Sequence, residues 1–302
     1  MFNLNDYYIA CSLSSGFGLL SVIISLTIII IIRRSRPQLY TIRHLLISNT
    51  CIASIIYCTV QTSNYIILIL FPSITSDIAC RWRGYFGYMS IAAATYSYLI
   101  PTVSRLFFSV FSIRYPWIIT FKVHYILIFI HWFVVIVIPL PSIITDDIYF
   151  RPGLLCWVPM QFFLHVLYTV FAYYAVPILA ILIIYVYIIK YIQRVKKRTK
   201  LIRNTASQKR DLDVLRNIVI LLSIYIAGGI PTLIFLATSI EAFYLLGIVT
   251  FTATVMVEKI CTIGLDRELR IAMKNTIFSR NRVMPFDNSA TRVIDQQYTT
   301  RF

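Results

Sequence analysis

The stretch LLSVIISLTIIIIIRRSR, residues 19–36, is apolar on every side when drawn as a helix and ends in a cluster of arginines. A helix with no polar face suits hydrocarbon rather than water. A strand of a membrane barrel would instead alternate polar and apolar residues over about ten positions. The run is too long for the apolar part of a secretory signal, and arginines after it are typical of a stop-transfer segment. The stretch therefore predicts a membrane-spanning helix that is kept as an anchor.

The rest of the chain repeats this pattern. Its 302 residues are 59% hydrophobic and 13% charged, with a mean hydropathy of +0.77. A water-soluble domain of this size has no core large enough to hide so much apolar surface. A helix needs about 20 apolar residues to cross the hydrocarbon layer. Seven runs meet this length, and we expect helices at residues 8–32, 44–71, 80–111, 123–140, 161–192, 212–238 and 242–264.

Basic residues concentrate in the first, third and fifth connections and after the last run. Lys and Arg resist translocation, so these segments are predicted to face the cytosol and the N-terminus the outside of the plasma membrane. The net charge of +16 comes from this inner face, where anionic membrane lipid is the expected partner. A basic excess spread between seven spans does not indicate nucleic-acid binding.

Cys80 and Cys156 are the two cysteines predicted to lie on the outer side, because the other four fall within apolar runs. Only that side is oxidising. A bridge between them would hold the second outer connection over the bundle. We predict this disulfide, with two unpaired thiols as the alternative.

Arg105 is a full charge inside the apolar stretch YSYLIPTVSRLFFSVFS, residues 96–112, and it follows Cys80 by 25 residues. That interval is roughly 37 Å of helix, enough to cross from the outer to the inner surface. With seven predicted helices and the outer cysteines, this spacing makes nearly the whole chain resemble the rhodopsin-like G-protein-coupled receptors. In that family the interval separates the disulfide cysteine from the Arg of an Asp-Arg-Tyr motif. The resemblance assigns Arg105 to this position, with Ser104 and Leu106 as its neighbours.

Further family landmarks match one by one: Asn49 in the second run, Trp132 in the fourth, Pro177 and Tyr185 in the fifth, and Pro231 in the sixth. Each alone is also explained by ordinary packing or by a helix kink, which membrane helices tolerate. Their order along the chain supports the resemblance.

The segment LDRELRIAMKN after the seventh run places apolar residues on one stripe and charges opposite. This resembles the family's short eighth helix on the inner membrane surface, with a simple basic tail as the alternative. The predicted fold is an all-α seven-transmembrane bundle with that amphipathic helix. Its parts are an outer N-terminus (1–7), the bundle (8–264), the amphipathic helix (265–278) and a cytosolic tail (279–302).

Three positions depart from the family pattern. Ser54 replaces the family's buried Asp of helix two, Gly229 replaces the aromatic of Cys-Trp-x-Pro, and Glu258 begins a helix-seven motif that lacks its proline. Two interpretations of Glu258 stay open. It returns a carboxylate to the family's sodium pocket, or it sits with Lys259 at the membrane interface, where both snorkel to water.

The resemblance also implies a switch at the inner face. Asp211 has the spacing from Pro231 of the family's acidic partner, so we expect an Arg105–Asp211 ion pair in the inactive state. Tyr185 is expected to contact Arg105 when the sixth helix moves, and Asp213 is the alternative acid. A lone Arg105 that snorkels to lipid phosphate is the competing interpretation. Pro101 is expected to bend this third helix because proline removes a backbone donor.

The outer segments are short, so any ligand must bind largely within the bundle. Family pocket positions fall on Arg83, Gly87, Tyr88, Trp157, Thr169, Tyr173, Thr232 and Leu236. Gly87 stands where amine receptors carry an Asp, so a biogenic amine is disfavoured. A small molecule or a short peptide is expected.

The predicted function is that of a receptor that activates a heterotrimeric G protein. Receptor kinase and arrestin are further expected partners, at Ser279, Ser289, Thr291, Thr299 and Thr300 of the tail. A chemosensory seven-helix receptor outside the rhodopsin-like class is the alternative, followed by a transporter or channel. The sequence shows no paired acids or nucleophile with a base, so neither an enzyme nor a metal or other cofactor is predicted. His124 and His131 lack a third ligand and are expected to pack.

Overall fold

The structure, a computed structural model, describes residues 4–35, 39–71, 76–112, 114–151, 155–198 and 205–278, with backbone alone at 4, 195–198, 205–219, 221–222 and 277–278. Within these ranges the regular structure is helical, which confirms the predicted all-α class. The helices are α1 (Leu4–Arg34), α3 (Ile42–Leu70), α4 (Asp77–Ser97), α5 (Leu99–Leu106), α6 (Phe121–Val137), α7 (Pro141–Ile144), α8 (Phe163–Val170), α9 (Val176–Arg198), α10 (Thr205–Thr238), α11 (Glu241–Leu265) and α12 (Arg267–Phe278).

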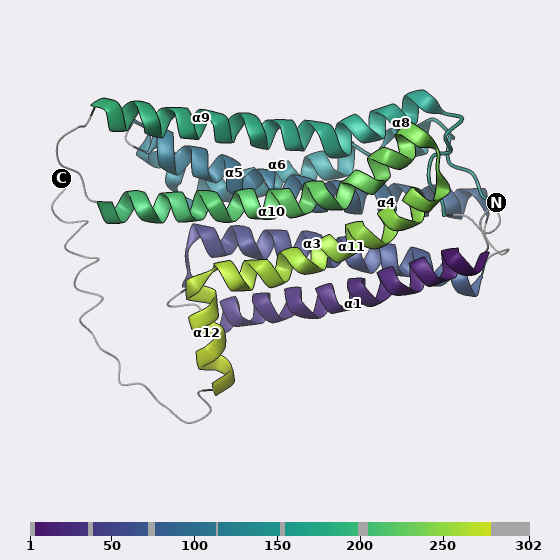
Figure 1. Cartoon of the computed structure of the whole chain (residues 1–302), viewed down its shortest axis with the longest axis horizontal. Helices are drawn as coiled ribbons and strands as arrows, with labels where there is room; N and C mark the ends of the chain where they lie inside the picture. Colours follow the sequence, from purple (N-terminus) through teal and green to yellow (C-terminus); the bar gives the residue numbers. More distant parts are fainter. Residues whose placement is uncertain are drawn as a thin grey trace.

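These helices form seven rods, counted over the described residues, that run side by side (Figure 1). The third rod joins α4, α5 and a π-helical turn, η1 (Phe107–Phe111), and a short 3-10 turn, η2 (Pro116–Ile119), leads into the fourth. The fourth is α6 with α7, and the fifth joins α8, a second π-helical turn, η3 (Phe171–Ala175), and α9. α12 leaves the end of α11 and runs across the bundle (Figure 1).

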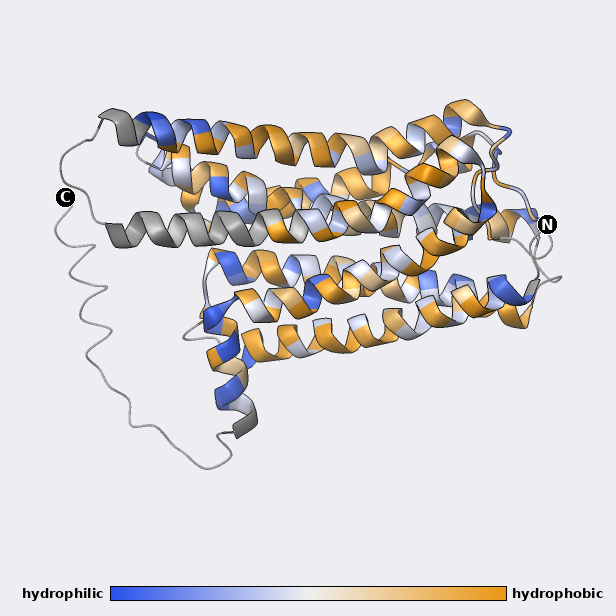
Figure 2. Cartoon of the chain, viewed as in Figure 1, coloured by the Kyte–Doolittle hydropathy of each residue, from blue (hydrophilic) through white to orange (hydrophobic). Residues whose placement is uncertain are grey.

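Apolar side chains cover the rods along their length, and polar residues gather at their ends (Figure 2). In the described part of the chain, five helices are long and apolar enough to cross a membrane, and a shorter apolar stretch of α10, Ser223–Thr238, adds to them. The third rod carries charges at its start, including Asp77 and Arg81. The first helix begins at Leu4, one turn before the predicted start at residue 8.

The third rod is interrupted at Tyr98. Its N–H bonds to the Thr95 carbonyl at 3.3 Å, which is a tighter turn than an α-helix makes. Pro101 follows one turn later and has no N–H to donate to the Ser97 carbonyl, so the regular ladder cannot pass through this point. The bend predicted from Pro101 is therefore confirmed as a break between α4 and α5.

The fifth rod adapts to its proline differently. Pro177 is the second residue of α9, and the wide turn η3 immediately precedes it. A π-helical turn inserts one extra residue and relieves the missing bond, and such turns often mark functional positions.

Small and polar residues line the contacts between rods. Ala53 of α3 and Ala92 and Ala93 of α4 are fully buried in the largest apolar cluster. Ser14 of α1 donates to Thr252 of α11 at 2.7 Å. Apolar lipid gives helices no hydrophobic reason to associate, so close packing of small residues and interhelical hydrogen bonds hold the bundle together.

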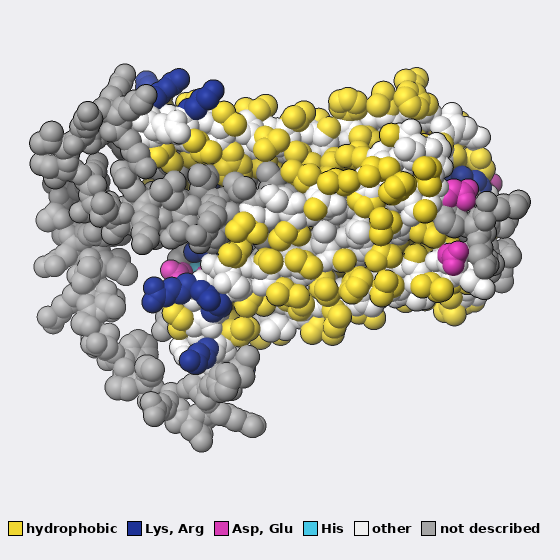
Figure 3. Space-filling model, viewed as in Figure 1, with side chains coloured by type: hydrophobic (Ala, Val, Ile, Leu, Met, Phe, Trp, Pro, Cys, Tyr) yellow, Lys and Arg dark blue, Asp and Glu magenta, His cyan; other side chains and the backbone are white. Residues whose placement is uncertain are grey.

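The two ends of the bundle differ in charge (Figure 3). We call the end with Cys80 and Cys156 the disulfide end and the opposite one the basic end. Exposed cations at the basic end are Arg33, Arg34, Arg114, Lys122, Lys190, Arg194, Arg267, Arg270 and Lys274.

At the basic end, Asp266 fixes the start of α12. Its carboxylate accepts the Leu269 N–H at 3.1 Å and pairs with Arg43 at 3.1 Å. Leu269 and Ala272 then pack on α1 residues such as Ile28. The amphipathic helix predicted for 265–278 is present as α12.

Candidate functional site

A disulfide holds the second outer connection against the third rod. Cys80 and Cys156 are joined, with their Cα atoms 5.3 Å apart. The Phe150 N–H donates to Asp77 at 2.8 Å, and Arg81 pairs with Asp146. A Cβ atom at Gly84 would collide with the connection, because the Cys156 carbonyl would lie only 2.7 Å away. The sequence prediction of this bridge is confirmed.

Asp147 ties the same connection to α8. Its carboxylate contacts His165 Nδ1 at 2.7 Å. Burial alone would raise the pKa of Asp147, but hydrogen bonds from His165 and Thr145 hold that pKa below its ordinary value. The contribution of this pair to stability is therefore present above the ordinary carboxyl pKa and is lost as the pH falls through the lowered value.

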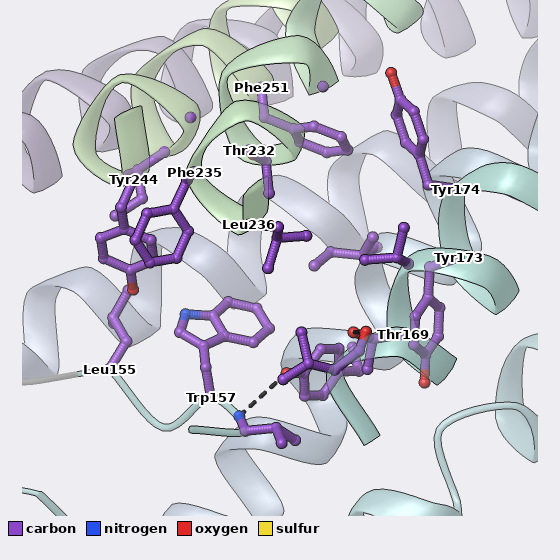
Figure 4. Close-up of a pocket in the computed structure, with 18 of the residues that line it drawn as sticks. Leu155, Trp157, Thr169, Tyr173, Tyr174, Thr232, Phe235, Leu236, Tyr244 and Phe251 are labelled. Carbon is purple, nitrogen blue, oxygen red and sulfur yellow. Dashed lines mark hydrogen bonds between the residues drawn. The ribbon is translucent and has the colours of Figure 1, made fainter. Parts of the chain in front are cut away.

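Beneath the connection lies a cavity of about 670 Å³. Six of the seven rods line it, the first through Tyr7 alone, together with Arg151, Leu155 and residues 157–160 of the connection. Figure 4 shows side chains from α8, η3, α10 and α11 around one space, with Trp157 below them. Six predicted pocket residues line it: Tyr88, Trp157, Thr169, Tyr173, Thr232 and Leu236.

The structure places the other two predicted pocket residues outside this lining. Arg83 turns toward α3, where its Nε and Nη2 donate to the Asn64 side chain and backbone, each at 3.4 Å. Gly87 lies behind Trp157, whose ring would be 3.2 Å from a Cβ atom at this position. The reasons differ, because Arg83 is held by Asn64 of α3 and the Trp157 indole covers Gly87.

Tyrosines dominate the cavity wall, and hydrogen bonds fix several of their hydroxyl groups. Tyr88 accepts the Val158 N–H at 3.1 Å and Tyr7 accepts the Leu155 N–H at 3.3 Å. Tyr174 donates to the Ile226 carbonyl at 2.8 Å. These bonds connect the loop and rods to one another and present the aromatic faces to the cavity.

Sequence reasoning missed Gln61, Tyr174, Tyr225 and Tyr244 as lining residues. Gln61 carried a usable signal, because an amide within an apolar run is expected to face the bundle interior. The tyrosines carried none, since the chain has many and most positions of this type face lipid or neighbouring helices.

Gly229 is where helix six departs from its family, and the structure shows what fills the space. A Cβ atom at Gly229 would overlap the ring of Tyr174 from the fifth rod. Tyr174 therefore packs directly on the α10 backbone at Gly229. The carbonyl of the preceding residue, Gly228, accepts a hydrogen bond from Thr250 of α11 at 3.2 Å. An aromatic from helix five takes the place of the aromatic that helix six lacks.

Tyr225 connects the cavity to the third rod. It lines the cavity, its hydroxyl lies 2.7 Å from Thr95 Oγ1, and its ring lies 5.6 Å from that of Tyr98. Thr95 donates to the Ile91 carbonyl, so Tyr225 is the donor between the two hydroxyls. The cavity floor thus contacts the break in the third rod directly.

Arg105 lies two turns beyond that break, at the end of α5. It is close enough to the Tyr185 hydroxyl of α9 to interact with it electrostatically, and Thr102 lies beside the same hydroxyl. The side chains of Asp211 and Asp213 are outside the described residues, so the predicted ion pair stays a prediction.

Ser104 is buried and turned away from Arg105, toward α6. Its hydroxyl lies 2.9 Å from His124 Nε2. His124 Nδ1 faces the Thr120 carbonyl at 2.9 Å, which requires the proton there and makes Nε2 the acceptor. His131 binds the Ala93 carbonyl instead. Both histidines pack between helices, and the described residues contain no group of three or more metal-ligating side chains.

Asn49 and Trp132 form a contact between the second and fourth rods, with the indole N–H donating to the side-chain oxygen of Asn49 at 3.1 Å.

Glu258 and Lys259 form an ion pair in which Nζ of Lys259 lies 2.8 Å from Oε2 of Glu258, and both side chains are buried. The interface interpretation of this pair is therefore wrong, because snorkelling side chains would be exposed. Lys259 lies near Cys51 and Cys58, and Ser54 shares their face of α3.

The sequence matches the family described as 7 transmembrane receptor (rhodopsin family) over residues 25–271, from the middle of α1 to α12. No curated protein matches the chain. The family match covers the end of the first rod, the other six rods, the disulfide, the cavity lining apart from Tyr7, and the Arg105 region. The chain therefore belongs to the rhodopsin family of seven-transmembrane receptors and is a multi-pass membrane protein.

Proposed function

We propose that this receptor binds a small molecule or short peptide in the cavity and activates a heterotrimeric G protein at the basic end. The disulfide end then faces the outside of the plasma membrane, as the positive-inside rule predicts. Receptors of the family act in this general way. The match also argues against a receptor outside the rhodopsin-like class and against a transporter or channel.

The observation that carries the proposal is the contact of Tyr225 with both the cavity and the third rod. A ligand that displaces the Tyr225 ring changes its contacts with Thr95 and Tyr98, where the rod is already broken. The far side of that break is α5, which carries Arg105. A ligand that binds one arrangement of this contact more tightly shifts the population toward it.

G-protein activation is tested by nucleotide exchange in membranes that contain the receptor and one G-protein family at a time. Arg105→Ala is expected to abolish receptor-dependent exchange. Asp211→Ala is expected to raise it without ligand, because the inactive state loses its ion pair. Arg194→Ala removes a different exposed cation of the same end and shows how much of the loss comes from reduced positive charge alone.

Two results would contradict this scheme. Exchange that is the same in wild type and Arg105→Ala for every G protein would remove Arg105 as the switch. Unchanged basal exchange in Asp211→Ala would remove the ion pair alone. Kinase and arrestin sites in the tail stay predictions, since residues 279–302 lie outside the described residues.

A further inference from the structure

The geometry of the cavity points to an uncharged, mainly aromatic ligand that carries a hydroxyl or N–H group at its inner end and donates it to Gln61. This inference rests on the proposed function and deepens it by naming the ligand class. It depends on three features of the described lining: an unpaired acceptor on Gln61, walls made of tyrosine and phenylalanine rings, and charges confined to the outer rim.

Gln61 lies on the face of α3 that lines the cavity, one turn from Tyr57 and one from Tyr65. It is only 2% exposed. Its Oε1 atom has no hydrogen-bond partner among the described residues. A buried acceptor without a partner costs free energy. Because Gln61 belongs to the cavity lining, a small rotation of its side chain lets a ligand in the cavity donate to it.

The orientation of the Gln61 amide follows from its neighbours. Its Nε2 lies 3.3 Å from the Gly87 carbonyl and 3.3 Å from Ser90 Oγ. A carbonyl only accepts, and Ser90 already donates to the same Gly87 carbonyl at 2.7 Å. Nε2 must therefore be the atom facing α4, which leaves Oε1 as the free acceptor.

Three other polar side chains of the lining already have partners. Tyr57 is hydrogen-bonded to Thr252 at 3.4 Å, and Tyr225 is bonded to Thr95. Thr169 donates to the Val166 carbonyl at 2.7 Å. A ligand therefore gains little by offering several polar groups, and one donor at its inner end matches what the wall offers.

The charges in the described lining are Arg151 and Glu241. Arg151 belongs to the outer connection and donates to the Trp157 carbonyl at 3.2 Å, and Glu241 is the exposed first residue of α11. Neither lies on the inner wall. An ammonium or carboxylate carried deep into the cavity would meet no opposite charge, and burying an unpaired ion is costly.

The cavity volume of about 670 Å³ falls within the range of sites for small organic ligands, about 300–1,000 Å³. Aromatic walls favour planar, apolar ligand bodies through offset and edge-to-face contacts. A short peptide brings a polar backbone that this wall leaves unpaired, so the structure favours the small-molecule alternative.

The test uses three probes of the same shape: biphenyl-4-methanol with a donor, 4-ethylbiphenyl without one, and 4-(aminomethyl)biphenyl with a charge. Binding to the receptor in lipid nanodiscs is measured from the shift of the unfolding midpoint against free probe concentration. Gln61→Met keeps the side-chain length and removes the acceptor. Gln161→Met, at an exposed amide of the outer connection, is the matched control, and Leu236→Trp fills the cavity.

For each variant, the dissociation constant of 4-ethylbiphenyl is divided by that of biphenyl-4-methanol. This ratio is then compared between variants, so that the partitioning of each probe into lipid cancels. We expect this ratio to be about 2- to 10-fold higher in wild type and Gln161→Met than in Gln61→Met, the effect of one neutral hydrogen bond. Leu236→Trp is expected to abolish the shift by every probe. If Gln61→Met does not fold, Gln61→Leu, which also removes the acceptor, takes its place in the same comparison.

A ratio that is equal in wild type and Gln61→Met would overturn the role of Gln61. Tighter binding of the ammonium probe than of the alcohol would overturn the uncharged ligand class. Equal shifts in wild type and Leu236→Trp would place the probes in lipid and remove the cavity as their site. None of these results changes the nucleotide-exchange assay, so G-protein activation stands or falls separately.

Discussion

The two halves of the bundle treat buried polar groups in opposite ways. Toward the disulfide end there is a cavity, and tyrosine hydroxyls around it are bonded to the loop and to neighbouring rods. Toward the basic end the interior holds an ion pair, Glu258–Lys259. Among the described residues, buried side-chain atoms without a hydrogen-bond partner or an ion pair are more numerous there, on Ser21, Ser25, Asn49, Ser54 and Tyr185, than in the cavity lining, where Gln61 Oε1 and Arg151 Nε are such atoms.

This difference indicates which half of the bundle keeps its arrangement of helices and which half rearranges. Satisfied hydrogen bonds around a cavity preserve its shape, which favours selective binding. Each unsatisfied buried group costs about 1–3 kcal/mol, so a second arrangement that pairs some of them is close in free energy. The half with Arg105 and Tyr185 is therefore the half expected to rearrange.

The largest expected effect tests the ion pair. Lys259→Met leaves the Glu258 carboxylate buried without its counter-charge, and breaking a buried pair in this way costs about 3–5 kcal/mol. The double variant Glu258→Gln/Lys259→Met removes both charges and is expected to recover much of that stability. Thermal unfolding of the purified receptor measures both.

Lys274→Met on the exposed face of α12 is the control for losing one positive charge. Its unfolding midpoint is expected to match wild type. If Lys259→Met were as stable as this control, the pair would contribute nothing to the basic half, and the contrast between the halves would fail.

A smaller effect is expected where the halves meet, at Gly229. A methyl group at this position overlaps the Tyr174 ring, and overpacking of this kind costs about 1–3 kcal/mol. Gly16→Ala is the matched control, because a Cβ atom there meets nothing within 4 Å. Alanine in place of glycine within a helix is otherwise stabilising by about 0.5–1 kcal/mol.

The variant Gly229→Ala/Tyr174→Ala separates the clash from other causes. Against the single variant Tyr174→Ala, which lacks the ring, Gly229→Ala should no longer lower the unfolding midpoint, as measured by thermal unfolding. If Gly229→Ala and Gly16→Ala shifted the midpoint equally, Tyr174 would not be the residue that fills the position of the missing aromatic.

The sequence predicted the rods, the disulfide and six lining residues for definite reasons. The length of an apolar run identifies a membrane span directly. The alternation of basic connections left Cys80 and Cys156 as the two cysteines on the outer side. Thr169, Tyr173, Thr232 and Leu236 followed from their register on helices that the resemblance had already aligned. Local pattern and helical geometry were sufficient for the rods and the disulfide, and the lining residues also needed the resemblance.

The remaining features depend on contacts between rods. Arg83 was misplaced because its partner Asn64 lies on another helix, and Gly87 because Trp157 covers it. Glu258 and Lys259 are neighbours in sequence, yet only the packing of α11 against α3 and the third rod shows that both are buried. Tyr174 has no sequence signal that connects it with Gly229.

The smallest expected effect tests the tyrosine clamps of the disulfide half. Tyr88→Phe keeps the ring stacked on Tyr173 but leaves the Val158 N–H without its acceptor. The expected loss of stability is about 1 kcal/mol, and hydrogen exchange at the Val158 amide should become faster because the connection opens more easily. Tyr187→Phe, on the half-exposed surface of α9, is the control and should leave that exchange rate unchanged. Equal exchange in Tyr88→Phe and wild type would show that the disulfide and the other contacts of the connection hold it without the Tyr88 hydroxyl. The shape of the cavity would then not depend on this hydroxyl contact.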